Sequence, residues 1–277
     1  MSTPKVIVVT GANRGIGLAI AQKLSQQASP VHLYACSRSG ATLPVTASTP
    51  TSKIRFATLD ITKASSIESL VKTISADEGR LDILINNAGT NDTGSWGKTI
   101  SPLDVINVNY HGTKNVCLAL LPLLVEAKDS RIVNVSSTGS NLHHYSSEVK
   151  STFRSADLKL SDLDALTDKY IAASKQGTAK EAGFGGANGY AVSKAAINAL
   201  TAVLARENAK KGVVANCCCP GWVDTDMGNI VGKPSKTPEE GSRIPVRLAI
   251  GDIEGVTGGY WGNDGVSDRG DGKVQEW

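Results

Sequence analysis

The chain has 277 residues, enough for one large α/β domain or two small ones, and its hydrophobic content of 40% is ordinary for a globular protein. The net charge of +3 is too small to indicate a nucleic-acid or membrane-surface partner. Three of the five cysteines are consecutive, Cys217–Cys219, and such neighbours are poor disulfide partners without metal-ligand spacing. A strand pattern begins by Lys5, which leaves no room for a signal peptide, and no apolar run is long enough to span a membrane. We therefore expect a cytoplasmic protein with no metal, nucleic-acid or membrane partner.

The N-terminal segment predicts a strand, a glycine turn and a helix. Val6–Val9 is a continuous apolar run, typical of a parallel strand buried on both faces, and an amphipathic helix extends through Gln26. Between them lie three glycines, which let a pyrophosphate approach the backbone at the positive helix N-terminus. A tight turn without a ligand would not need three glycines at this spacing. The turn therefore predicts a dinucleotide site formed by Gly11, Asn13, Arg14, Gly15, Ile16 and Gly17.

With the preceding Thr10, the turn reads TGxxxGIG. This motif resembles the opening signature of the short-chain dehydrogenase/reductase family. The resemblance implies an α/β fold, in which a doubly wound parallel sheet (Rossmann fold) binds a nicotinamide cofactor. The motifs that follow extend the resemblance over essentially the whole chain, so we expect a single domain over residues 1–277.

The second strand, Val31–Cys36, indicates which cofactor is bound. An acidic residue at this strand end would bond the ribose 2′-hydroxyl of NAD, whereas Ser37-Arg38 follows here. Arg38 and Arg14 favour the 2′-phosphate of NADP(H), although either arginine could merely point into solvent. The next segment, Ser39–Ser52, is rich in Ser, Thr and Pro and predicts a mobile loop.

Two further strands lead to expected cofactor contacts. The strand Ile54–Leu59 ends at Asp60-Ile61, and an amphipathic helix follows over Ser65–Ala76. The family resemblance implies that the aspartate contacts the adenine, although an acid at a helix N-terminus explains it nearly as well. The strand Leu81–Ile85 runs into an NNAG motif that in the family lies against the adenosine ribose, here Asn87, Ala88 and Gly89.

Two polar residues before the C-terminal half match family positions. After a loop that carries Trp96, a helix is expected to begin near Ser101-Pro102, because proline is favoured at the first helical position. The resemblance implies that Asn109 of this helix holds a water in a proton relay, and a buried asparagine at a helix kink is the alternative. The strand Arg131–Val135 precedes Ser137, which the resemblance implies binds the substrate carbonyl and the catalytic tyrosine.

The pair Tyr190 and Lys194 is the expected chemical centre. Residues i and i+4 share a helix face, and an ammonium near a phenol lowers the phenol pKa from about 10. Such a tyrosine can donate a proton to a carbonyl oxygen, so both residues are expected to be catalytic and to contact the cofactor. Tyr110 and Lys114 have the same spacing, but they adjoin Asn109, and we interpret Tyr110 as a packing residue.

The segment between Ser137 and Tyr190 is longer than in most family members. Its amphipathic part, roughly Leu142 to Asn188, predicts a helical insertion before the catalytic helix. A similar insertion characterises the monomeric, NADPH-dependent carbonyl reductases within the family, where it covers the oligomerisation face. We therefore expect a monomer.

The C-terminal part predicts a strand over Gly212–Cys218, a substrate loop over Gly228–Lys236 and a last strand over Gly258–Trp261. The family resemblance implies that the turn between the first two contacts the nicotinamide and phosphates through Pro220, Gly221, Val223 and Thr225. Trp222 would line the pocket for flat or aromatic carbonyls, or would be a core residue.

We therefore expect NADPH-dependent reduction of carbonyl compounds, namely ketones, aldehydes and quinones. A specialised biosynthetic ketoreductase or alcohol dehydrogenase is one alternative. The other is a non-catalytic NADP(H)-binding sensor.

Overall fold

The computed structural model describes residues 3–93, 99–124 and 130–277. The expected loop at Trp96 lies outside these residues. In the described part of the chain, eight strands form one sheet in the order β3-β2-β1-β4-β5-β6-β7-β8, parallel except for the antiparallel pair β7–β8. The strands are β1 (Lys5–Thr10), β2 (Val31–Ser37), β3 (Lys53–Thr58), β4 (Ile83–Asn86), β5 (Arg131–Val135), β6 (Val214–Cys218), β7 (Tyr260–Gly262) and β8 (Lys273–Gln275).

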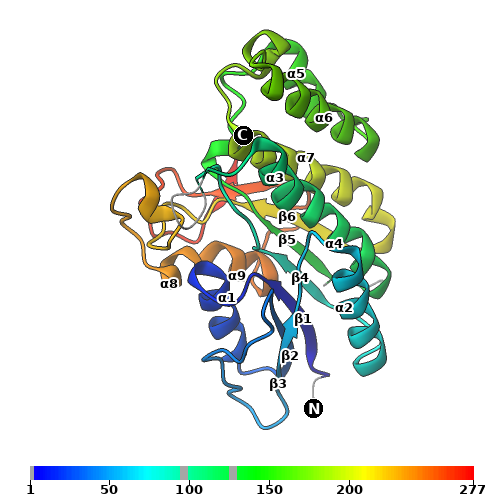
Figure 1. Ribbon diagram of the computed structural model, residues 1–277. Coiled ribbons are helices and arrows are strands. Elements are labelled where there is room, and N and C mark those ends of the chain that lie inside the picture. Colours follow the sequence, from blue (N-terminus) through cyan, green and yellow to red (C-terminus); the bar gives the residue numbers. More distant parts are fainter. Residues whose placement is uncertain (1–2, 94–98, 125–129) are drawn as a thin grey trace.

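Helices cover both faces of the sheet (Figure 1). They are α1 (Gly15–Ser25), α2 (Ala64–Asp77), α3 (Pro102–Ile106), α4 (Thr113–Leu120), α5 (Ser147–Phe153), α6 (Leu160–Gln176), α7 (Gly189–Glu207), α8 (Pro238–Gly241) and α9 (Arg243–Ile250). A π-helical turn, Asn107–Gly112, joins α3 to α4. No helix in the described residues is long and apolar enough to cross a bilayer.

The apolar run of β1 shows why this sheet is buried on both sides. Val6 and Val8 belong to one hydrophobic cluster, which also contains residues of α2, α4 and α7. Ile7 and Val9 belong to a second cluster, on the opposite face, with residues of α1 and α9. Because strand side chains alternate between faces, a central strand between two helical layers needs apolar residues at every position. The predicted doubly wound parallel sheet is confirmed.

The strand order determines where a ligand can bind. Chain connections run in opposite directions from β1 and β4, which lie side by side at the centre of the sheet. In such sheets, ligands bind beyond the carboxyl ends of the strands at this point of reversal. The segments that follow β1, β4, β5 and β6 all leave from that edge, and they contain the motifs identified in the sequence.

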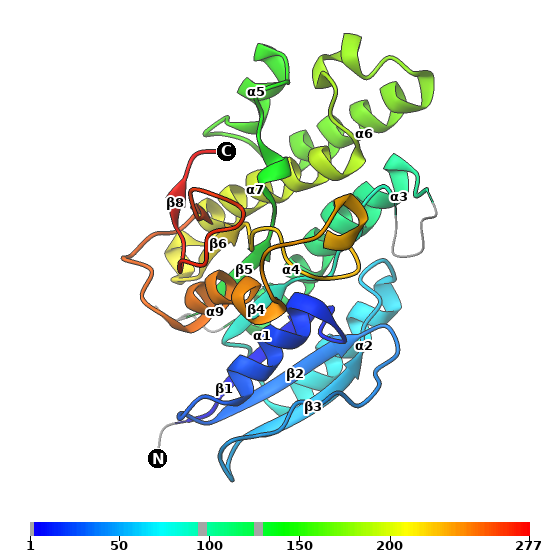
Figure 2. The same cartoon turned by 90° about the vertical axis from the view of Figure 1, so that its left-hand side faces the viewer.

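The segment expected to be helical, 142–188, contains α5 and α6, which lie beside α7 at the top of Figure 1. Figure 2 shows the same two helices apart from the β2–β3 end of the sheet. Helix α6 buries one face, formed by Leu163, Leu166, Tyr170 and Ile171. Its polar face remains in solvent, which is the pattern of an amphipathic helix on a protein surface.

In the described residues, the sheet has one strand more than the sequence predicts. The strand near Trp261 is not the last one, because Lys273–Gln275 pairs with it in antiparallel register. This three-residue strand is short and mostly exposed, so it has no apolar pattern by which to predict it. The segment 39–52 has no helix or strand, as expected, but Gln22 of α1 donates to Pro44 O and Gln26, the residue after α1, donates to Thr46 O. Its expected mobility stays a prediction.

Candidate active site

The glycine turn after β1 has a backbone that only glycine fits. Gly11 and Gly15 have φ values of +64° and +53°, in the left-handed region. A Cβ on Gly17 would lie 2.2 Å from the Gly11 carbonyl oxygen, so α1 begins directly against the preceding turn. Asn13 and Arg14 are exposed at the start of this helix, and Ile16 is partly buried. The turn therefore presents bare backbone and a helix N-terminus, which is the cradle that a pyrophosphate requires.

The NNAG motif after β4 lies against this turn. The Asn87 amide Nδ2 donates to the carbonyl oxygens of Thr10 and Gly11, both at 3.1 Å. The Thr10 hydroxyl in turn accepts from the backbone amides of Asn87 and Ala88, both at 3.0 Å. These reciprocal bonds join the ends of two adjacent strands and leave Gly89 exposed beside the site. The motif thus fixes the wall next to the glycine turn.

The two arginines expected at the 2′-phosphate differ in their surroundings. Arg38 is exposed, and within the described residues no carboxylate or other acceptor binds its guanidinium. Arg14 forms an ion pair with Asp226, so it bridges the glycine turn and the segment after β6. Both side chains of that pair are about half exposed, which leaves the pair weak and easily exchanged.

Asp60 and Ile61 follow β3 and have local partners. The Asp60 carboxylate accepts from the backbone amide and the hydroxyl of Thr62, at 3.1 and 2.6 Å. These bonds, the hydroxyl's first among them, lower the pKa of the carboxyl. Ile61 is buried, and a Cβ on Gly112 would lie 2.9 Å from it. The bonds between the Asp60 carboxylate and Thr62 lie just before α2. They fit the alternative interpretation of Asp60 as an acid near a helix N-terminus.

The segment after β6 approaches the glycine turn from the other side. A Cβ on Gly15 would lie 2.9 Å from the Thr225 methyl group. Gly221, beside Pro220, has φ +87°, and the buried Lys236 ammonium donates to Pro220 O at 2.8 Å. Val223 is buried and pairs with Lys236 as an isolated bridge. The expected phosphate and nicotinamide contacts are therefore held over the same edge as the glycines.

Trp222 is partly buried beside the loop 228–236, and its expected place in the substrate pocket stays a prediction. Its indole N–H donates to Gly228 O at 2.9 Å, and its ring lies 3.3 Å from the Cβ position of Gly232. The side chain is partly exposed and supports the loop 228–236.

Tyr190 and Lys194 lie on the first turns of α7, opposite the end of β5. Asn188 caps the helix, since its side-chain oxygen accepts from the Ala191 amide at 2.9 Å. The Lys194 ammonium is 5.6 Å from the centre of the Tyr190 ring and donates to Val135 O at 2.8 Å. The Ser137 hydroxyl interacts with the phenol of Tyr190 and lowers its pKa, against the larger effect of burial. Helix spacing and the β5 terminus therefore bring the three predicted groups together.

Asn109 lies in the π-helical turn, fully buried beside the same cluster. Its side-chain oxygen accepts from Thr90 N at 2.8 Å, and its Nδ2 donates to Thr90 O at 2.8 Å and Ser193 Oγ at 2.9 Å. A Cβ on Gly89 would lie 3.1 Å from the Asn109 oxygen and 3.8 Å from the Lys194 ammonium. π-helical turns often mark functional sites, and this one binds the Asn109 side chain to Thr90 and Ser193, next to the helix turn that carries Lys194.

Two family models match the chain. The model of short chain dehydrogenases matches residues 5–153, and one described as enoyl-(acyl carrier protein) reductase matches residues 171–258. The chain belongs to the short chain dehydrogenase family. Carbonyl reductase (NADPH) 1 of Sus scrofa is 36% identical, over 100% of this chain and 95% of its own. The (+)-neomenthol dehydrogenase of Arabidopsis thaliana is 33% identical, over 90% and 92%.

Solved structures agree on the fold. Salutaridine reductase from Papaver somniferum has a TM-score of 0.77 at 27% identity, over 94% of this chain and 99% of its own. Menthone neomenthol reductase from Mentha piperita has a TM-score of 0.76 at 26% identity, with the same coverage. The described sheet and its flanking helices are thus those of other short chain dehydrogenases.

The electrostatics of this short chain dehydrogenase differ from the expectation at one point. Burial raises the pKa of Tyr190 to about 12, although the Ser137 hydroxyl opposes the shift. Burial likewise lowers the pKa of Lys194 to about 8. The phenol pKa is therefore raised where the sequence predicted that it is lowered, because withdrawing the phenol from water is the largest effect on it.

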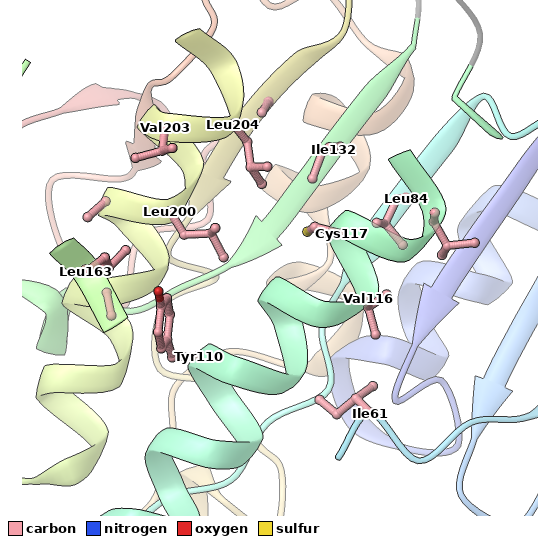
Figure 3. Close-up of a cluster of buried hydrophobic side chains, with 14 of the residues drawn as sticks. Ile61, Leu84, Tyr110, Val116, Cys117, Ile132, Leu163, Leu200, Val203 and Leu204 are labelled. Carbon is pink, nitrogen blue, oxygen red and sulfur yellow. The ribbon is translucent and has the colours of Figure 1, made fainter. Parts of the chain in front are cut away.

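The competing pair has a separate environment. Tyr110 is fully buried among apolar side chains between α4 and α7, as Figure 3 shows. Its hydroxyl donates to Asp164 of α6 at 2.7 Å, and the Lys114 ammonium donates to both oxygens of that carboxylate. Burial, followed by the Asp164 hydrogen bond, raises the pKa of the phenol well above its usual range. The burial of Tyr110 fits its interpretation as a packing residue, which stays a prediction.

Sequence reasoning missed two residues that the geometry connects to Tyr190. Ser193 donates to Tyr190 O at 2.7 Å, and the Asp92 carboxylate accepts from Tyr190 N at 3.0 Å. The hydroxyl of Ser193 could have been noticed, because it lies between the tyrosine and the lysine in the sequence. No local pattern indicates Asp92, which lies in an irregular segment 98 positions earlier.

Proposed function

We propose that this chain reduces carbonyl compounds to alcohols with NADPH, with Tyr190 as the proton donor. The observation that carries the proposal is the meeting of Ser137, Tyr190 and Lys194 beside a glycine cradle at the carboxyl edge of the sheet. The chain is an NADPH-dependent oxidoreductase of the short chain dehydrogenase family, and its relatives at 35–36% identity include carbonyl reductases named for NADPH.

The cofactor site fits NADP(H). The turn at Gly11, Gly15 and Gly17 has no room for side chains, since Cβ atoms there would lie within 2.9 Å of neighbouring atoms. Its backbone therefore stays bare at the start of α1, where it would accommodate the pyrophosphate. Arg38 has a guanidinium free to bind the 2′-phosphate, and Arg14 could join it by exchanging Asp226. We assign the adenosine side to Asp60, Ile61, Asn87, Ala88 and Gly89, and the nicotinamide side to Pro220, Gly221, Val223 and Thr225.

The chain's own residues bind and protonate the substrate in this proposal. NADPH supplies the hydride to the carbonyl carbon. Ser137 and Tyr190 donate hydrogen bonds to the carbonyl oxygen, which then takes the phenolic proton as negative charge develops on it. With a pKa of about 12, Tyr190 is protonated at neutral pH, as a proton donor must be. Lys194 stabilises the phenolate that remains, and Asn109 lies where it could help to return a proton from water.

The proposed substrate class rests on Trp222 and the loop 228–236. Trp222 contacts the loop 228–236 through its bond to Gly228 O. We propose that the loop admits ketones, aldehydes and quinones, with flat or aromatic compounds favoured. A specialised biosynthetic reductase is a second candidate, because the chain is also similar to (+)-neomenthol dehydrogenase and to salutaridine reductase.

The test is NADPH oxidation with a panel of quinones, aromatic aldehydes, α-dicarbonyls and cyclic monoterpene ketones. We expect Tyr190→Phe to lower kcat by about 10²–10⁴-fold, the usual contribution of a general acid, without loss of NADPH binding. Tyr110→Phe is the matched control and should retain activity. If Tyr110→Phe is inactive and Tyr190→Phe is not, the proton donor has been misassigned. Turnover of a terpene ketone alone would favour the specialised reductase, and NADPH binding with no turnover at all would favour a sensor.

A further inference from the structure

Asp92 lies where the segment after β4 meets the start of α7. Its carboxylate oxygen Oδ2 accepts from the backbone amide of Tyr190 at 3.0 Å, and its own carbonyl oxygen accepts from Ile100 N at 2.7 Å. A Cβ on Gly189 would lie 2.8 Å from the other carboxylate oxygen, so the first residue of α7 is packed against it. Asp92 therefore satisfies one free amide at the helix N-terminus, while Asn188 satisfies the next.

The backbone N–H and the backbone carbonyl oxygen of Tyr190 are both held by hydrogen bonds, and these bonds belong to one connected set. Asp92 binds its N–H, and Ser193 binds its carbonyl oxygen at 2.7 Å. Ser193 accepts from Asn109, which binds the backbone of Thr90 twice. Thr90 is two residues before Asp92, so the set returns to where it began. The position of the Tyr190 backbone thus depends on a carboxylate that contacts neither Ser137 nor Lys194.

The carboxylate also acts on Tyr190 through its charge. The groups that face the phenol come from four elements: Ser137 after β5, Cys219 after β6, Lys194 on α7 and Asp92 after β4. After burial, the Ser137 hydroxyl lowers the phenol pKa, whereas Cys219 and Asp92 raise it. Asp92 is thus the carboxylate among them, and it favours the protonated phenol. Such a phenol holds its proton until the substrate oxygen takes it.

We propose that Asp92 is a positioning residue for this reaction, one that fixes the backbone of Tyr190 against Ser137 and sets the pH range over which Tyr190 donates its proton. The inference rests on the proposed function, in which Tyr190 is the proton donor. Asp92 touches neither cofactor nor substrate in this role. It acts only through Tyr190, so its replacement should alter kcat and the pH profile and leave NADPH binding unchanged.

The test compares Asp92→Asn and Asp92→Ala with a matched control, Asp104→Asn. Asparagine keeps an acceptor for Tyr190 N and removes the charge, whereas alanine removes both. Asp104 is an exposed acid at the N-terminus of the neighbouring helix α3, where its side chain accepts from Ser101. For each variant the measurements are the pH profile of kcat, the Kd for NADPH and the hydrogen-exchange rate of the Tyr190 amide.

We expect Asp92→Asn to keep a kcat close to wild type below neutral pH, with the alkaline limb of kcat moved to lower pH. Asp92→Ala should lower kcat by about 10- to 100-fold, as misplaced catalytic groups do, and should speed exchange of the Tyr190 amide. Asp104→Asn should change none of these. If Asp92→Ala fails to fold, the pH limb of Asp92→Asn decides the question.

Two outcomes separate the inference from the function beneath it. Wild-type kcat, pH profile and amide exchange in both Asp92 variants, with an inactive Tyr190→Phe, would overturn the role of Asp92 alone. An active Tyr190→Phe would overturn the proposed proton donor, whatever the Asp92 variants do.

Discussion

At the scale of single residues, Lys194 gives the site a pH dependence that can be measured. Burial lowers the pKa of its ammonium to about 8, so the free enzyme loses this charge as pH rises through that value. Because kcat/KM reports the free enzyme, we expect kcat/KM for NADPH to fall above a pH of about 8. The neutral amine no longer attracts the anionic cofactor or stabilises a phenolate.

Replacement by arginine provides the check on this assignment. Lys194→Arg keeps its charge at every accessible pH, so the decline above a pH of about 8 should disappear even though the overall rate is lower. A decline that persists unchanged in Lys194→Arg would assign it to another group. The pKa of Lys194 also affects stability. Because it is about 8 in the folded protein and about 10.4 in the unfolded chain, only the unfolded chain holds the proton between these pH values. The free energy of unfolding should therefore rise with pH over that range.

The same residue shows what a sequence pattern leaves out. The spacing of Tyr190 and Lys194 indicates a shared helix face, and in the structure the Lys194 ammonium lies 5.6 Å from the centre of the Tyr190 ring. The spacing contains no information about how far each group is withdrawn from water. That quantity depends on β5, β6 and the segment after β4, and it reverses the expected direction of the Tyr190 pKa. A role for Asp92 could not be predicted for a related reason, since Asp92 and Tyr190 come close to each other only in the folded chain.

At the scale of elements, Asp164 joins α6 to the helix that follows the π-helical turn. It accepts from the buried Tyr110 hydroxyl and from the Lys114 ammonium, whose side chain is only 12% exposed. We expect Asp164→Ala to lower the free energy of unfolding by about 1–3 kcal/mol, because two buried donors lose their acceptor. The measurement is urea unfolding followed by circular dichroism.

Two variants test the cause of that loss. The double variant Asp164→Leu/Lys114→Met should recover part of the stability, since it removes the stranded charge. Glu148→Ala breaks an exposed ion pair with Lys169 between α5 and α6 and should change little. Equal effects of Asp164→Ala and Glu148→Ala would show that burial of the Asp164 contacts is irrelevant.

The elements themselves were predictable to different degrees. The central strands could be read from the sequence because burial on both faces demands unbroken apolar runs, as at Val6–Val9. The helix at Ser101-Pro102 begins as predicted, where the serine hydroxyl accepts from Asp104 N. Strand β8 lacked any such signal, because a short, exposed edge strand is specified by its partner β7 and not by its own residues.

At the scale of the whole molecule, the packing of α6 on α7 determines how much apolar surface is left for contact with a second copy of the chain. Helix α6 lies on α7 and buries its apolar face there. In the described part of the chain, the large hydrophobic side chains left exposed are few and lie on different segments: Leu118 on α4, Val231 after β6, Val266 between β7 and β8, and Val274 on β8. Scattered residues of this kind do not form an association surface, whereas stable dimers need a contiguous patch.

We therefore predict that the chain is a monomer with a mass near 28.9 kDa by sedimentation over a wide range of concentration. The double variant Leu163→Asp/Ile171→Asp tests the reason, because it places charges on the buried face of α6 and should release that helix. The uncovered face of α7 should then make the variant self-associate as concentration rises. A wild-type dimer would contradict the prediction directly. A variant that stays folded and monomeric would show that α6 is not what prevents association.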